Sequence, residues 1–170
     1  DYYAEMTGIN DNESLTTRYK NTLILWCGSM NEPVKIDDPC TAVDIVPTLL
    51  NLFGFDYDSR LLSGRDVLAP DADPGNASTD MHVAIFADYG GGYSWITRAG
   101  TYEASLGTFT PAKDVTLDDQ DSYISSMNEL VRNRYSMAKY IVQTDYYRHV
   151  FPNWKGGMTL TEALAGSAGN

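Results

Sequence analysis

Three aspartates, Asp56, Asp58 and Asp66, stand close together in the sequence and could in principle hold a hard divalent cation. Carboxylate oxygens are the ligands that Mg²⁺ and Ca²⁺ prefer. However, the three residues belong to a segment rich in turn-forming residues, where acids are ordinarily solvated. Solvated loop acids are therefore the favoured interpretation, and a metal site here is the weaker one.

The sequence lacks the common local signatures of catalysis. Gly-x-Ser-x-Gly, Gly-x-Gly-x-x-Gly before a helix and His-Glu-x-x-His are all absent. The two histidines, His82 and His149, have no ligand spacing with Cys27 and Cys40, so we expect no zinc site. A disulfide between the two cysteines and a pair of reduced thiols are both compatible with the sequence.

Glycines 90–92 join two strand-like runs. They lack the lysine and the following helix of a phosphate-binding loop, so a tight hairpin turn is the favoured interpretation. The nearby aromatic residues could form an exposed platform for sugar rings, or they could pack beneath a helix. Their exposure separates the two possibilities; they are Tyr89, Tyr93, Trp95 and Tyr102.

The first half of the chain predicts a strand and two helices. Residues 22–27, Thr-Leu-Ile-Leu-Trp-Cys, form a continuous apolar run that is typical of a strand buried on both faces of a parallel sheet. A capping-box-like start at Thr41–Asp44 precedes apolar residues at helical spacing, which predicts a helix that ends at Gly54. Ser14–Tyr19 predicts a short helix.

The second half predicts an antiparallel meander followed by one long helix. Residues 82–87, 93–98 and 101–106 are strand-like, and Asp118–Val150 has an apolar stripe at helical steps. We expect this helix to lie across the meander. The resulting α/β organisation has a strand–loop–helix segment over residues 1–70, a meander-plus-helix subdomain over residues 71–154 and a flexible tail over residues 155–170.

Composition excludes several classes of function. The chain has 170 residues, a net charge of −11 and 43% hydrophobic residues. Its acidity disfavours nucleic-acid binding, and contact with an anionic membrane through basic patches, because both surfaces carry negative charge. No apolar run approaches the roughly 18 residues of a membrane span. Because the first residue is Asp1 and not methionine, we expect a processed product or a segment of a longer protein.

Three stretches, Asn21–Trp26, Pro39–Gly54 and Asp58–Asp66, together resemble the C-terminal part of the sulfatase-like enzymes of the alkaline phosphatase superfamily. There, a buried strand is followed by a helix of the form Asp-Ile-x-Pro-Thr-Leu-x-Asn-Leu-x-Gly and then by Gly-x-Asp. The chain looks most similar to the lipoteichoic acid synthase and phosphoglycerol transferase branch, which Ser94–Thr97 and Asp145–Arg148 also resemble. The resemblance covers roughly residues 1–151.

This resemblance implies the C-terminal segment of an alkaline-phosphatase-like fold: a strand and helix of the central sheet, the small meander and the long helix. It also implies a membrane-anchored parent protein on the extracellular face of a bacterial membrane, with a divalent metal (Mn²⁺ or Mg²⁺) and a threonine nucleophile that takes glycerol phosphate from a lipid. The nucleophile lies in the N-terminal half of such enzymes. That half would be the partner of this chain, and lipid or glycerol phosphate the substrate. The isolated chain would be inactive, with no catalytic residue and no metal of its own.

The family places an Asp-His pair of metal ligands where this chain begins. Asp1 matches the aspartate and is the one candidate metal ligand; the alternative is an acid with no special role. Tyr2 stands where histidine is expected, and a phenol is a poor ligand at neutral pH because its pKa is near 10. The motif residues Asp44, Thr48 and Asp66 are interpreted as structural.

Two other functions are compatible with the sequence. The first is a non-enzymatic extracellular module that binds a glycan or a glycerol-phosphate polymer through its aromatic side chains. The second is an inactive relative of the sulfatases, which the tyrosine at position 2 suggests.

Overall fold

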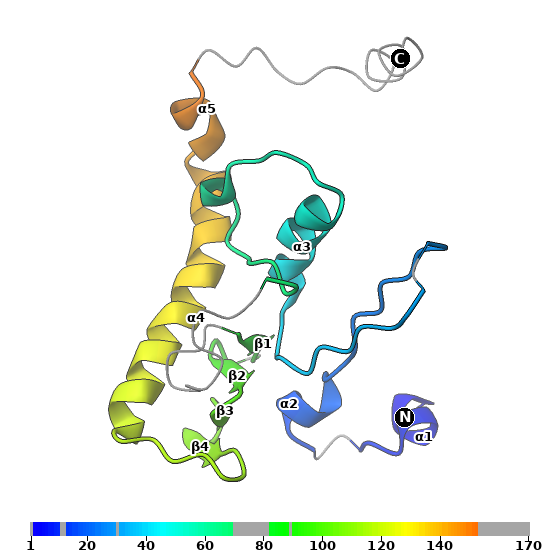
Figure 1. Cartoon of the computed structure of the whole chain (residues 1–170). Helices are drawn as coiled ribbons and strands as arrows, with labels where there is room; N and C mark the ends of the chain where they lie inside the picture. Colours follow the sequence, from blue (N-terminus) through cyan, green and yellow to red (C-terminus); the bar gives the residue numbers. More distant parts are fainter. Residues whose placement is uncertain (1, 11–12, 30, 70–81, 89, 153–170) are drawn as a thin grey trace. The chain divides into compact units, whose positions relative to one another are not determined.

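The computed structural model describes residues 2–10, 13–29, 31–69, 82–88 and 90–152 (Figure 1). The chain is a mixed α/β protein that divides into two compact units, residues 1–134 and residues 135–170. Helix α4 (Gln120–Gln143) begins in the first unit and ends in the second. The predicted boundary near residue 70 and the predicted tail from residue 155 lie outside the described residues.

A four-stranded antiparallel sheet is the centre of the first unit (Figure 1, green). Its strands follow one another in chain order: β1 (Ala84–Ala87), β2 (Tyr93–Thr97), β3 (Gly100–Glu103) and β4 (Thr108–Pro111). The predicted meander is therefore confirmed, but the sequence analysis missed β4. This edge strand is mostly exposed and ends in proline, so it lacks the apolar alternation that marks a half-buried strand.

The turn between β1 and β2 is the hairpin that the glycines predicted. Gly91 has a φ of 85°, which is a left-handed conformation that side chains rarely adopt. The backbone N–H of Asp88 donates to the carbonyl oxygen of Gly92 at 2.9 Å and closes the turn. The register that follows pairs Ala87 with Tyr93 and Ile85 with Trp95.

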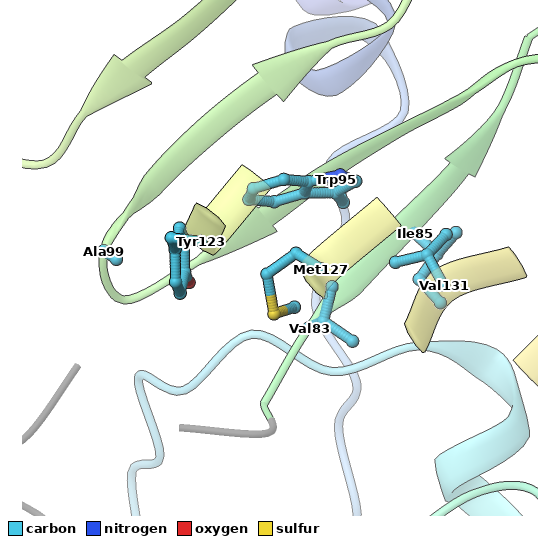
Figure 2. Packing of buried hydrophobic residues seen from close by; sticks show 7 residues of the cluster. All are labelled: Val83, Ile85, Trp95, Ala99, Tyr123, Met127 and Val131. Atoms are coloured by element: carbon cyan, nitrogen blue, oxygen red, sulfur yellow. The ribbon is translucent and has the colours of Figure 1, made fainter. Parts of the chain in front are cut away.

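The apolar core lies between this sheet and the first half of α4 (Figure 2). Three helix residues at four-residue steps, Tyr123, Met127 and Val131, present one face to the strands. Trp95 of β2 is fully buried at the centre. The remaining buried members of the cluster are Val83, Ile85 and Ala99. All seven come from residues 83–131, so the sheet and α4 share one core.

The predicted single helix over residues 118–150 is interrupted. Helix α4 ends at Gln143, and a second helix, α5, covers Tyr146–Val150. Between them Asp145 has a φ of 50° and a ψ of 44°, a left-handed conformation that ends the α4 hydrogen-bond ladder. The hydroxyl of Thr144 also donates to the carbonyl oxygen of Tyr140 at 2.7 Å, and such bonding to a helix carbonyl competes with helix continuation.

Three α-helices precede the sheet in sequence: α1 (Tyr2–Thr7), α2 (Leu15–Arg18) and α3 (Ile45–Leu52). The α2 helix confirms the short helix predicted near Ser14, whose side chain accepts a hydrogen bond from the backbone N–H of Thr17 as an N-cap. Helix α2 contacts β2 and β3, and the buried hydroxyl of Thr16 donates to the Glu103 carboxylate. This contact attaches the N-terminal part of the unit to the sheet.

The prediction of a strand at Thr22–Cys27 is wrong for this structure. The segment is extended but pairs with no strand in the part of the chain that the structure describes. Ile24 is 81% exposed and Trp26 is 82% exposed. A strand needs a neighbouring backbone to satisfy its N–H and C=O groups, and none of the described segments supplies one here.

None of the helices in the described ranges has the length and apolar character to cross a lipid bilayer.

Candidate functional site

The candidate metal ligand Asp1 lies outside the described residues. Its neighbour Tyr2 lies on α1 and is exposed. Within the described ranges, no three His, Cys, Asp or Glu side chains come close enough together to hold a metal ion. These residues do not fit a complete divalent-metal centre, and any such centre needs ligands from elsewhere.

Of the three loop acids, Asp66 has a defined structural role. One carboxylate oxygen accepts a hydrogen bond from the Asn51 side-chain amide, and the other accepts one from the backbone N–H of Leu68, both at 2.9 Å. Asp56 is exposed and Asp58 is half-buried in the irregular segment before it. Asp66 therefore closes a turn, as the sequence analysis interpreted it, and fastens that turn to α3 (Ile45–Leu52).

Asp44 is the most connected buried acid near the motif, with only 2% of its surface exposed. One of its oxygens accepts a hydrogen bond from the backbone N–H of Thr41, and the other accepts one from that of Arg65, both at 2.9 Å. The Arg134 guanidinium of α4 lies 3.9 Å from the second oxygen. A single carboxylate thus joins the start of α3, the Gly-x-Asp turn and the long helix.

Two opposing effects, burial and the nearby Asp44 carboxylate, act on the pKa of Arg134. Burial lowers the pKa of Arg134, the Asp44 carboxylate raises it in part, and the positive charge of Arg65 lowers it further. Asp44 therefore provides the negative charge that Arg134 needs at this buried position. A charge pair with little exposure depends on both partners, because either one left alone is poorly solvated.

The helix predicted to start at Thr41–Asp44 and to end at Gly54 is confirmed. A 3₁₀ turn at Ala42–Asp44 leads into α3, and Gly54 has a φ of 67° just after it. The fully buried Thr48 donates to the Asp44 carbonyl oxygen at 2.6 Å and accepts from the backbone N–H of Val67 at 3.0 Å. A Cβ at Gly64 would overlap the carbonyl group of Val43. The motif positions hold backbone segments together.

A second ion pair, which the sequence analysis missed, joins Asp38 to Arg98. The guanidinium Nε lies 2.5 Å from a carboxylate oxygen, and each side chain is about a quarter exposed. Arg98 follows β2, so the pair fastens the segment before α3 to the sheet. The two residues are 60 positions apart, and no sequence spacing links residues at that separation.

The hydrogen bond from Arg98 holds the pKa of Asp38 below its ordinary value of 3.8, although burial opposes the shift. Smaller contributions in the same direction come from the charges of Arg98, His82 and Arg65. Because the folded-state pKa is the lower one, this carboxylate stabilises the fold fully above about pH 5. That stabilisation is lost as the pH falls through 3.8 towards the folded value.

We expect Arg98→Gln to remove this dependence. The variant loses about 1 kcal/mol at pH 7, because the pair is partly exposed, and its stability falls less steeply than that of the wild type below pH 5. Urea unfolding measured between pH 3 and pH 7 tests this. The control is Lys35→Gln, which breaks an exposed pair with Asp37 and leaves the pH profile unchanged. Parallel profiles for wild type and Arg98→Gln would contradict the assignment.

Neither cysteine forms a disulfide in the structure: Cys27 is exposed and Cys40 is half-buried. Burial raises the pKa of the Cys40 thiol, and the negative charge of Asp44 raises it further. Cys40 is therefore protonated at neutral pH and is a weak nucleophile.

The aromatic side chains proposed as a sugar platform belong largely to the core. Trp95 is fully buried, and its ring lies 5.3 Å from Tyr102 in a stacked arrangement. Tyr93 and Tyr102 are partly buried and pack against the same cluster. Of the two alternatives that the sequence left open, packing beneath the helix therefore applies to Trp95, which is the centre of the core. Tyr89 lies outside the described residues.

A shallow depression of about 260 Å³ lies at the N-terminal end of α4. Its acidic residue Asp119 accepts a hydrogen bond from the backbone N–H of Ser122 at 2.9 Å and so caps the helix. Its lining residues are Leu117, Asp118, Asp119, Ser122, Tyr123 and Ser126. The polar groups here satisfy a helix end and do not form a nucleophile–base pair.

The described polar contacts thus build a scaffold around Asp44 and do not assemble a reaction centre. No protein-family model, curated protein or solved structure matches this chain.

Proposed function

We propose that this chain is the C-terminal segment of a metal-dependent sulfatase-family phosphoglycerol transferase, or of a related phosphodiester or sulfate ester enzyme. It would complete an alkaline-phosphatase-like fold. The N-terminal half of the same protein would supply the threonine nucleophile and most ligands for Mn²⁺ or Mg²⁺, with Asp1 as the ligand from this chain. The parent protein would act on a lipid or glycerol-phosphate substrate at the extracellular face of a bacterial membrane.

The apolar run Leu23–Trp26 carries this proposal. Leu23, Ile24 and Trp26 are exposed and Leu25 is half-buried, and the backbone of the run forms no hydrogen bond with any described residue. Four consecutive apolar residues have apolar groups on both faces of an extended chain, because alternate side chains point in opposite directions. Such a segment is stable when it is paired with another strand and covered on both sides. A missing sheet therefore accounts for both the composition and the exposure of the run.

Helix α3 supports the same proposal. One side of it is buried through Pro47 and Thr48, while Val46, Leu52 and the adjacent Phe53 are more than half exposed. An exposed apolar surface on a short helix marks a face that another element covers. In an open α/β sheet, helices cover the strands in this way. The run Leu23–Trp26 would then be a strand of this sheet, and α3 would be a helix that covers the sheet.

The aromatic binding module receives no such support, because Trp95 lies in the core. The role that we propose for this chain is structural: it extends the central sheet and adds the meander and α4 beside it. Asp44 and Thr48 would keep α3 in the orientation in which it covers this sheet.

The full-length protein, including the N-terminal half, tests the proposal. With Mn²⁺ and a chromogenic phosphodiester, we expect turnover by the full-length protein and none by the isolated chain. Trp26→Asp in the full-length protein should reduce turnover at least about 10-fold, because a charge would enter a buried sheet. The matched control is Leu106→Asp, an exposed apolar residue in the turn between β3 and β4, which should leave turnover unchanged.

Turnover by the isolated chain would refute the proposal directly. Equal effects of Trp26→Asp and Leu106→Asp would show that the apolar run is not buried in the parent. A folded full-length protein that lacks turnover would instead favour the inactive sulfatase relative that Tyr2 suggests.

A further inference from the structure

Only two residues, Thr144 and Asp145, separate α4 from α5. The hydrogen-bond ladder of α4 ends with the bond from the backbone N–H of Thr144 to the carbonyl oxygen of Tyr140 at 3.0 Å. Helical bonding resumes with the bond from the N–H of Arg148 to the carbonyl oxygen of Asp145, also at 3.0 Å. The interruption is therefore a property of one left-handed residue, Asp145, and not of a loop.

The sequence across this junction is compatible with a continuous helix. Apolar residues recur at helical steps on both sides of it, at Ile141, Val142 and Tyr146. The junction contains neither glycine nor proline, the two residues that most strongly disfavour a helix. In an unbroken helix, the N–H groups of Asp145 and Tyr146 would donate to the carbonyl oxygens of Ile141 and Val142. Local sequence therefore permits a straight helix as well as the observed bend.

One side-chain contact is specific to the bent form. The rings of Tyr140 and Tyr146 lie 5.9 Å apart. Residues six positions apart in a straight helix are separated by about 9 Å along its axis and lie on different faces, so this contact would be lost there. The Arg148 guanidinium lies 2.9 Å from the Asp145 carboxylate, but a pair three residues apart is possible in both forms. An aromatic contact therefore favours the bend, and the steric cost of the left-handed aspartate opposes it.

The junction is not enclosed by a core. Every residue from 135 to 151 is exposed or half-buried, whereas the buried residues of α4, Tyr123, Met127 and Val131, all precede this range. The aromatic contact, the exposed hydrogen bonds and the steric cost at Asp145 are each small, and burial adds to none of them. Two backbone conformations at this one residue are therefore close in free energy.

We propose that Asp145 is a hinge between two states of the C-terminal helix. In the bent state α4 and α5 are separate, as in the structure, and in the straight state one helix covers residues 120–150. The states exchange when the backbone angles of Asp145 pass between the left-handed and the helical region. This exchange changes the direction in which α5 presents Tyr147, Val150 and Phe151 relative to the end of α4. The inference uses the junction alone and does not depend on the proposed enzyme function.

Distances between two spin labels test the hinge on the whole chain, with Cys27→Ser and Cys40→Ser as the background. Labels at the exposed positions Ser136→Cys and His149→Cys are about 20 Å apart along the axis in the straight state and closer together in the bent state. Double electron–electron resonance should show both separations. Asp145→Ala should raise the ratio of straight to bent at least about fivefold, because alanine favours a helix and disfavours the left-handed conformation. Asp145→Gly should lower the ratio by about the same factor, because glycine adopts that conformation freely.

The matched control makes the same two changes at Glu129, an exposed acid within α4. Glu129→Ala and Glu129→Gly should leave the ratio of the two separations unchanged. One separation that stays the same in the background protein and in both Asp145 variants would overturn the inference, because the junction would then be rigid. An equal response to the Glu129 variants would also overturn it, because general helix stability would then explain the shift. The helical signal in circular dichroism verifies that each variant is folded.

Discussion

Replacing Trp95 by alanine is expected to lower the free energy of unfolding by about 3–5 kcal/mol. The indole is fully buried, and three aromatic rings surround it: those of Tyr102, Phe109 and Tyr123 lie within 5.3–6.0 Å. Its N–H also donates to the Asn128 side chain of α4 at 2.9 Å. Truncation would leave a large cavity between the sheet and the helix, and Asn128 would lose its partner. Urea unfolding followed by far-ultraviolet circular dichroism measures the change.

Trp26→Ala is the matched control, because it removes the same side chain from a position that is 82% exposed. In the isolated chain we expect a change within about 0.5 kcal/mol. Similar losses for the two variants would show that the centre of the core lies elsewhere. The pair also separates two properties of tryptophan in this chain: Trp95 stabilises the described fold, whereas Trp26 matters only when the proposed sheet covers it.

Removing the carboxylate of Asp44 is expected to cost about 3–5 kcal/mol. The backbone N–H groups of Thr41 and Arg65 would lose their acceptor, and the largely buried Arg134 guanidinium would lose the carboxylate that it faces. With a typical total stability of about 5–15 kcal/mol, Asp44→Ala should bring the chain close to unfolding. Urea unfolding gives the loss, and hydrogen exchange should show the largest increase in residues 41–69.

Two further variants make this prediction specific. Asp37→Ala, at an exposed acid nearby, should change stability by less than about 0.5 kcal/mol. Adding Arg134→Met to Asp44→Ala should restore part of the lost stability, because the guanidinium that faced the Asp44 carboxylate is removed while the side-chain volume is kept. If the double variant is no more stable than Asp44→Ala, the charge pair is not what makes Asp44 important.

Local sequence determined most of the regular elements. The glycines at 90–92 require a tight turn, the spacing of Tyr123, Met127 and Val131 requires one helical face against a core, and Asp44 with Gly54 defines the ends of α3. These signals act over a few residues, so they can be recognised without knowing the rest of the fold. The interruption at Asp145 escaped them because an aspartate is acceptable within a helical pattern as well as at a helix end.

Burial and long-range pairing depended on tertiary structure alone. Trp26 and Trp95 both lie in strand-like apolar runs, yet one is exposed and the other fully buried, because only the second run pairs with neighbouring strands in the described fold. The partners of Asp38 and Asp44 are likewise distant in sequence. Sequence spacing encodes contacts within a helix or a hairpin, but which charges meet across separate elements is determined only when those elements pack together.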